Sequence, residues 1–138
     1  MEAPTPVIVY LHGNCGSRID SFDVAEVALA KKISVFTFDF GGSGMSEGEY
    51  VSLGVRESMD IKSIVEYLRN SGEVSHIILW GRSMGSVSAL RYAARYPNID
   101  VLVNDSPFSS LHEVCIEKVQ RYKFIPRAVA ELMVLSMR

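Results

Sequence analysis

Apolar runs alternate with amphipathic segments along this chain. The runs are rich in β-branched and aromatic residues and cover residues 6–12, 33–40, 75–80 and 99–105. Their near-continuous hydrophobicity predicts strands that are covered on both faces of a sheet. The clearest helical period lies between the second and third runs, in residues 55–70, where apolar residues recur at Ile61, Ile64, Val65 and Leu68.

Two further segments, residues 20–32 and 84–96, also predict helices, and the second of them ends before Pro97. The clearest helix is expected to stop at Ser71-Gly72. The resulting order is β-α-β-α-β-α-β. This order predicts an α/β fold with three layers, in which a parallel sheet of about four strands has helices on both faces.

The unusual loops of the sequence all follow predicted strands. They read HGNCGSR, DFGGSGMSEGE, GRSMG and NDSPFSS in chain order. In an open parallel sheet, the loops after the strands meet at the carboxyl edge, which is where ligands bind. The sequence therefore predicts one site, built from several loops, at this edge.

The third loop, Gly81-Arg82-Ser83-Met84-Gly85, has the G-x-S-x-G pattern of a nucleophile elbow. A serine in this strand-to-helix turn is strained, and Gly81 and Gly85 remove side chains that would collide where strand and helix approach. The hydroxyl then lies at a helix start, where free N–H groups favour an oxyanion. We predict that Ser83 is a nucleophile; the alternative is an ordinary turn in which it caps a helix.

The first loop begins with His12-Gly13-Asn14. Acyl transfer requires two donors aimed at the tetrahedral oxygen, and we predict the backbone N–H groups of Met84 and Asn14 for this oxyanion hole. Gly13 allows the backbone to turn close to a substrate. For His12, hydrogen bonding within the loop is favoured over a role as proton carrier.

Four segments together resemble the α/β-hydrolase fold, and more closely its serine-aminopeptidase-like and prolyl-oligopeptidase-related branch. They are VIVYLHGNCGSR, FTFDFGGSGMSEG, LWGRSMGSVSALRYA and VNDSPFSSL, in the family's order. The resemblance covers residues 6 to about 111, the N-terminal and central part of that fold. It implies the same nucleophile and oxyanion hole, together with a loop after the second strand that is shaped by Asp39, Gly42 and Gly44. The chain departs from many relatives at Gly41, where they carry arginine.

A serine nucleophile needs a base, which is commonly a histidine oriented by a carboxylate. In this fold the chain order is serine, acid, histidine. Asp105 is a candidate triad acid, although a turn-forming or loop-anchoring role is favoured for it. His112 is the one histidine after the elbow, and an exposed position at a helix start is favoured for it. His76 opens a strand at the end opposite the predicted site.

The resemblance implies that the acid and histidine follow two further strands, and no further strand is evident after residue 105. We therefore expect residues 1–138 to form a partial α/β-hydrolase domain with an incomplete core. Residues 109–138 predict two short helices, separated near Pro126, at the start of a cap or connection. The segment alone is expected to be inactive, and strand 99–105 would present an unpaired edge through which a dimer could form.

Composition excludes several other classes of protein. A net charge of -2, with 48% hydrophobic and 22% charged residues, gives no reason to expect a nucleic-acid partner. The segment GGSGMSEG matches neither phosphate-binding pattern, because Glu47 stands where the third glycine of G-x-G-x-x-G is required. No cofactor is expected. Cys15 and Cys115 show no metal-ligand spacing, so we expect free thiols and no metal.

The sequence contains no apolar run of the length that spans a bilayer and no cleavable leader, which favours a cytoplasmic protein. The leading functional prediction is a serine hydrolase that cleaves an acyl bond in an ester, thioester, amide or peptide. Its substrate is a small molecule or a peptide, and a membrane lipid is compatible with the pattern. The alternative is a catalytically incomplete hydrolase-like module that uses the same edge for binding.

Overall fold

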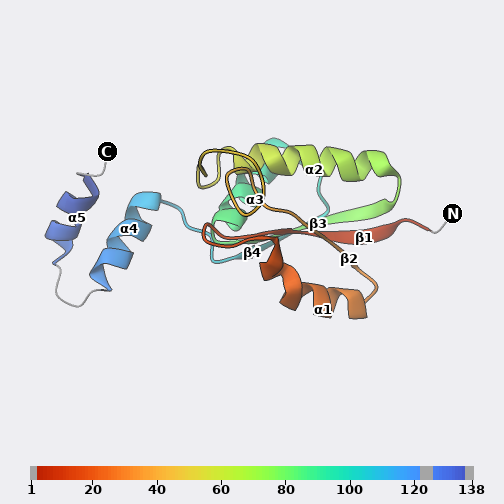
Figure 1. The fold of residues 1–138 in the computed structure, drawn as a ribbon, viewed down its shortest axis with the longest axis horizontal. Helices are drawn as coiled ribbons and strands as arrows, with labels where there is room; N and C mark the ends of the chain where they lie inside the picture. The colour runs from red at the N-terminus through yellow and green to blue at the C-terminus, as the bar shows by residue number, and fades with distance from the viewer. Residues whose placement is uncertain (1–2, 122–125, 136–138) are drawn as a thin grey trace. The chain divides into compact units, whose positions relative to one another are not determined.

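The computed structural model describes residues 3–121 and 126–135, which fall into two units divided after Pro107. All the strands described belong to the first unit. They are β1 (Thr5–Leu11), β2 (Ser34–Thr37), β3 (Val74–Arg82) and β4 (Val101–Asp105). The helices of this unit are a 3-10 turn η1 (Arg18–Ser21), α1 (Phe22–Ala30), α2 (Glu57–Ser71) and α3 (Met84–Arg95) (Figure 1).

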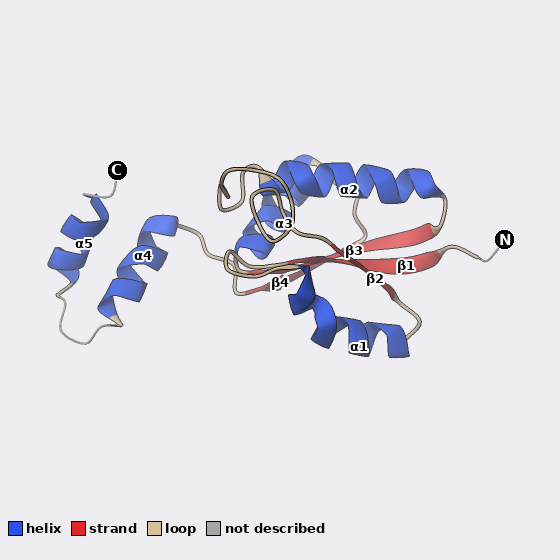
Figure 2. Ribbon diagram, viewed as in Figure 1, coloured by secondary structure: helices blue, strands red, loops and turns tan. Residues whose placement is uncertain are grey.

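The four strands form one parallel sheet in the order β2-β1-β3-β4. Helix α1 lies on one face of the sheet, and α2 and α3 lie on the other (Figure 2). The predicted three-layer α/β architecture is therefore confirmed. Strand β4 is an edge strand, as expected, and its Val101 is 48% exposed. Dimer formation through that edge stays a prediction.

The main hydrophobic core lies between the sheet and the pair α2 and α3. Alternate residues of a strand point to the same face, and those of β1 and β3 that face these helices are buried: Val7, Val9, Leu11, Ile77 and Leu79. The apolar stripe of α2 meets them through Ile61, Val65 and Leu68, which are also buried. The helical period seen in the sequence thus marks the face that packs on the sheet.

The ends of some elements differ from the predicted ranges. Strand β2 stops at Thr37 instead of residue 40, because Asp39 and Phe40 turn away to make bonds with the loop after β1. Strand β3 continues to Arg82 and so reaches the serine of the elbow. Helix α2 ends at Ser71 and is capped by Gly72, whose φ of 74° is the left-handed conformation expected there.

The second unit contains α4 (Leu111–Gln120) and α5 (Arg127–Leu135), the two short helices expected in residues 109–138. The Ser110 side chain caps α4 by accepting a hydrogen bond from the Glu113 amide. Whether this unit begins a cap stays a prediction. Among the described residues of both units, no helix combines the length and the apolar character needed to cross a membrane.

Candidate active site

Ser83 occupies the junction between β3 and α3. Its φ of 51° and ψ of -112° lie outside the regions that residues with a Cβ normally adopt. The strand continues to Arg82 and the helix starts at Met84, so one residue makes the whole turn. A conformation of this kind costs about 1–3 kcal/mol and persists only where the surrounding structure holds it in place.

Contacts on both sides hold this turn. The Ser83 amide donates to the Asp105 carbonyl at 2.8 Å, and the Ser83 carbonyl accepts from the Val87 amide at 3.0 Å. A Cβ on Gly81 would lie 2.5 Å from the Gly85 carbonyl oxygen, and a Cβ on Gly85 would overlap the carbonyl of Leu11 in β1. The two glycines therefore allow β3, α3 and β1 to meet at the elbow without side chains between them.

The loop after β1 passes close to this serine. A Cβ added to Gly13 would lie 3.8 Å from the Ser83 Cβ, which places the predicted oxyanion loop beside the elbow. Met84 is the first residue of α3, so its N–H has no partner within the helix. The Asn14 N–H donates no hydrogen bond within the described chain. Among the described residues, neither predicted donor has a hydrogen-bond partner, and their catalytic role stays a prediction.

His12 is fully buried, and both of its ring nitrogens are engaged. Nε2 accepts the Phe40 amide at 3.1 Å, and Nδ1 lies 2.8 Å from the Gly13 carbonyl oxygen. In the neutral ring Nδ1 therefore carries the hydrogen and donates a hydrogen bond to the Gly13 carbonyl oxygen. The ring also packs edge-on against the Phe40 ring, and the two ring centroids are 5.0 Å apart. These contacts support the expected role in loop bonding rather than proton transfer.

Asp39 joins the loops that follow β1 and β2. Its buried carboxylate accepts the Arg18 amide at 2.7 Å, the Arg18 guanidinium at 2.9 Å and the Met45 amide at 3.0 Å. The amide bonds from Arg18 and Met45 hold the pKa of this carboxyl below its ordinary value, although burial opposes them. A Cβ on Gly44 would collide with the carboxylate. The sequence placed Asp39 in this loop but gave no sign of Arg18 as its partner.

Asp39→Ala is expected to lower the free energy of unfolding by about 2–4 kcal/mol at pH 7, because two amide groups and a guanidinium lose their acceptor. The folded pKa is lowered, so the charged carboxylate contributes fully above its unfolded pKa of about 4. The contribution is lost as pH falls through the lower folded pKa. Urea unfolding should therefore show a difference between variant and wild type that shrinks as the pH falls below the unfolded pKa of about 4. Asp23→Ala, at an exposed position on α1, is the matched control and should have little effect.

The remaining triad candidates have exposed side chains. The Asp105 carboxylate accepts the Ser106 hydroxyl at 2.8 Å and lies 3.8 Å from the Arg82 guanidinium, contacts that suit an anchor for the loop. His76 lies near the start of β3, at the end of the strand opposite Ser83. His112 lies in α4 of the second unit, 3.9 Å from Glu113. The loop-anchoring role favoured for Asp105 stays a prediction, as does its less favoured alternative of triad acid.

Glu57, the first residue of α2, is a buried residue for which no role was predicted. Its buried carboxylate accepts the Ser52 amide, the Ser52 hydroxyl and the Gly54 amide, each at 2.7 Å. Burial alone would raise its pKa, but these hydrogen bonds outweigh burial and the pKa is lowered. Glu57 therefore fixes the end of the long loop that leads from β2 to α2. A signal was present in the pattern S-x-G-x-x-E before an apolar helical period.

A parallel sheet with a strained serine in a sharp strand-to-helix turn is characteristic of the α/β-hydrolase fold. The family model for serine aminopeptidases, S33, matches residues 2–137, and the chain belongs to this family. The resemblance seen in the sequence is therefore confirmed.

Known proteins agree with this assignment. The chain is 31% identical over 118 residues to lysophosphatidylserine lipase ABHD12 of Danio rerio, an alignment that covers 81% of this chain and 30% of the lipase. The Pyrococcus furiosus esterase Pf2001 superposes with a TM-score of 0.80 at 27% identity, covering 94% of this chain and 53% of the esterase. For a Paleococcus ferrophilus monoacylglycerol lipase, the TM-score is 0.66 at 25% identity, with 91% and 52% covered. The chain thus spans about half the length of these solved structures and less than a third of the Danio rerio lipase.

Proposed function

We propose that this chain is the nucleophile-bearing part of a serine hydrolase that cleaves carboxylic esters. The observation that carries the proposal is the strained backbone of Ser83, φ 51°, at the carboxyl edge of the sheet. Similar proteins are named as an esterase, a monoacylglycerol lipase and a lysophosphatidylserine lipase. Those names favour an ester, including an ester of a lipid, over a thioester, amide or peptide.

In the proposed reaction, the Ser83 oxygen forms a bond to the ester carbonyl carbon while a base takes the hydroxyl proton. The carbonyl oxygen becomes an oxyanion, which accepts hydrogen bonds from the N–H groups of Met84 and Asn14. The bond to the alcohol then breaks, and the alcohol leaves with the proton. Water repeats the attack on the acyl-enzyme, which releases the carboxylic acid and restores Ser83.

The base and its acid partner are proposed to come from residues outside this chain. Both ring nitrogens of His12 are engaged, and His76 lies at the far end of β3. A hydrolase of this class without its histidine retains only the acceleration that the oxyanion hole and binding supply. Residues 1–138 alone are therefore expected to show little turnover.

A fluorophosphonate probe tests the proposal on the whole protein, because it reacts with activated serines and mimics the tetrahedral intermediate. After proteolysis, mass spectrometry should locate the phosphonyl group on the peptide that contains Ser83. Residues 1–138 labelled in parallel should react far more slowly. Labelling at another serine, or at none, would contradict the assignment.

The alternative, a hydrolase-like binding module, is favoured by one observation: neither histidine of the first unit is placed to activate Ser83. A binding module would bind an acyl ester without labelling at Ser83 and without releasing acid. Titration of a non-hydrolysable ether analogue, compared with turnover of the matching ester, separates these two functions.

Asn14→Pro is expected to slow the reaction of the whole protein with a p-nitrophenyl ester about a hundred- to a thousandfold in kcat, because it removes one oxyanion donor. Asn14→Ala keeps the backbone N–H and is expected to stay within a few-fold of wild type. Equal losses in both variants would show that the side chain, and not the N–H, is required.

A further inference from the structure

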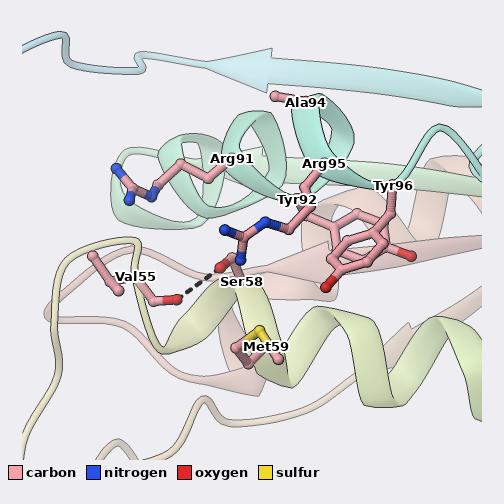
Figure 3. A pocket seen from close by; sticks show the side chains of 8 residues that line it. All are labelled: Val55, Ser58, Met59, Arg91, Tyr92, Ala94, Arg95 and Tyr96. Carbon is pink, nitrogen blue, oxygen red and sulfur yellow. Dashed lines mark hydrogen bonds between the residues drawn. The ribbon is translucent and has the colours of Figure 1, made fainter.

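A cavity of about 480 Å³ lies between α2 and α3. It is lined by Val55, Ser58 and Met59 on one side and by Arg91, Tyr92, Ala94, Arg95 and Tyr96 on the other (Figure 3). Its volume falls within the range of roughly 300–1,000 Å³ that is typical of small-molecule sites. At a rise of about 1.5 Å per residue, its arginines lie about 10–16 Å along α3 from Met84. The cavity is therefore separate from the candidate active site.

One part of this cavity is cationic. Arg91 and Arg95 are one helical turn apart on α3, and both are exposed. Neither makes an ion pair or a side-chain hydrogen bond with any described residue. The carboxylates at the start of α2 are engaged elsewhere: Glu57 binds the loop before α2, and Asp60 accepts the Gly41 amide at 3.0 Å. The two guanidinium groups are thus available to an anion.

The other lining residues offer apolar surface. The Tyr92 ring is buried and lies 5.2 Å from the Tyr96 ring, and its hydroxyl donates to the Asn98 side chain at 2.6 Å. Burial raises the pKa of Tyr92, so the phenol stays neutral. Met59 is 46% exposed, and its unbranched thioether adapts to the shape of a ligand. Val55 is 54% exposed beside it.

We propose that this cavity binds a carboxylate that carries an apolar chain, as in a medium-chain fatty acid. The planar forks of Arg91 and Arg95 match the geometry of a carboxylate head group. The chain then lies against Met59 and the partly exposed Tyr96 ring. The Ser58 hydroxyl donates to the Val55 carbonyl at 2.7 Å, so the arginines supply the donors for the head group. Figure 3 shows Arg95 extending from α3 in the direction of Ser58 and Met59. This site does not depend on Ser83 or on ester hydrolysis.

Isothermal titration with sodium decanoate, below its micellar concentration, tests the proposal. We expect the double variant Arg91→Gln/Arg95→Gln to raise the Kd at least tenfold. 1-Decanol, which has the same chain without the charge, should bind at least tenfold more weakly than decanoate. Lys31→Gln/Lys32→Gln removes two exposed charges next to α1 and is the matched control; its Kd should stay within twofold of wild type.

Ala94→Trp tests the cavity in a second way, because it adds bulk at an exposed helix position while keeping both arginines. It should also raise the Kd at least tenfold, and a melting temperature near that of wild type shows that the variant is folded. The absence of decanoate binding, or equal binding of 1-decanol, would overturn the proposal. Decanoate binding that survives both cavity variants would place the ligand elsewhere, at Ser83 for example, and would overturn it as well.

Discussion

Ser83→Ala is expected to abolish fluorophosphonate labelling and ester hydrolysis in the whole protein, because it removes the oxygen that we propose forms the covalent bond. Its folding stability should stay close to that of wild type, since alanine keeps the Cβ and therefore the backbone strain. Intact-mass measurement after labelling gives the first result, and urea unfolding gives the second. Ser110→Ala, which removes the hydroxyl that caps α4, is a serine control that should keep full labelling.

Ser83→Gly removes the Cβ as well as the hydroxyl, so comparing it with Ser83→Ala measures the backbone strain at this position separately from the loss of the reactive oxygen. It should also abolish labelling, but glycine adopts positive φ without the steric cost of a Cβ. The strain of about 1–3 kcal/mol is relieved, and the larger entropy of the unfolded chain offsets about 0.5–1 kcal/mol of that gain. We therefore expect Ser83→Gly to be more stable than Ser83→Ala by about 1 kcal/mol. A less stable glycine variant would show that the turn is not strained.

Gly85→Ala is expected to destabilise the fold by about 3 kcal/mol or more, at the upper end of the usual cost of overpacking. The added methyl group would overlap the carbonyl of Leu11 and lie 2.8 Å from that of His12. Both obstacles are backbone atoms of the central strand and the loop after it, so no side chain can rotate to make room. Either α3 moves away from β1, or the strand shifts and moves the loop after β1 with it.

Gly41→Ala is the control for that experiment. Gly41 has no positive φ, and an added Cβ would meet nothing closer than the Asp60 carboxylate at 3.5 Å, an ordinary contact. It should change the free energy of unfolding by less than about 1 kcal/mol. Chemical unfolding of both variants measures the difference. Equal stability of the two variants would contradict the close packing of α3 on β1.

The helices and strands of the first unit were predictable from local patterns, because buried positions are occupied by apolar residues at the spacing of a strand or a helix. Alternate residues in the apolar runs of β1 and β3 pack against α2 and α3, and Ile61, Val65 and Leu68 of α2 show the period of a packed helix. The elbow was also predictable, since close backbone contact requires glycine at positions 81 and 85 whatever the rest of the chain does.

Features that depend on distant partners were not predictable in the same way. Phe38 to Phe40 have the composition of a strand, but the amide of Phe40 bonds to His12, 28 residues earlier in the chain. The partner of Asp39 is Arg18, from another loop. The cavity beside Arg91 and Arg95 depends on how α2 and α3 pack, and no short pattern encodes this.

The bond from the Ser83 amide to the Asp105 carbonyl links the elbow to the outermost strand of the sheet. It directly follows the pairing of Arg82 with Asp105, the last of the β3–β4 register. Among the described residues, β4 has a neighbour on one side only, and the end of such a strand opens more readily than the centre of a sheet. When that end opens, the turn at Ser83 loses a restraint and can relax. The strained backbone of Ser83 therefore persists only while the end of β4 stays paired with β3. Hydrogen exchange at the Ser83 amide measures how often this end opens.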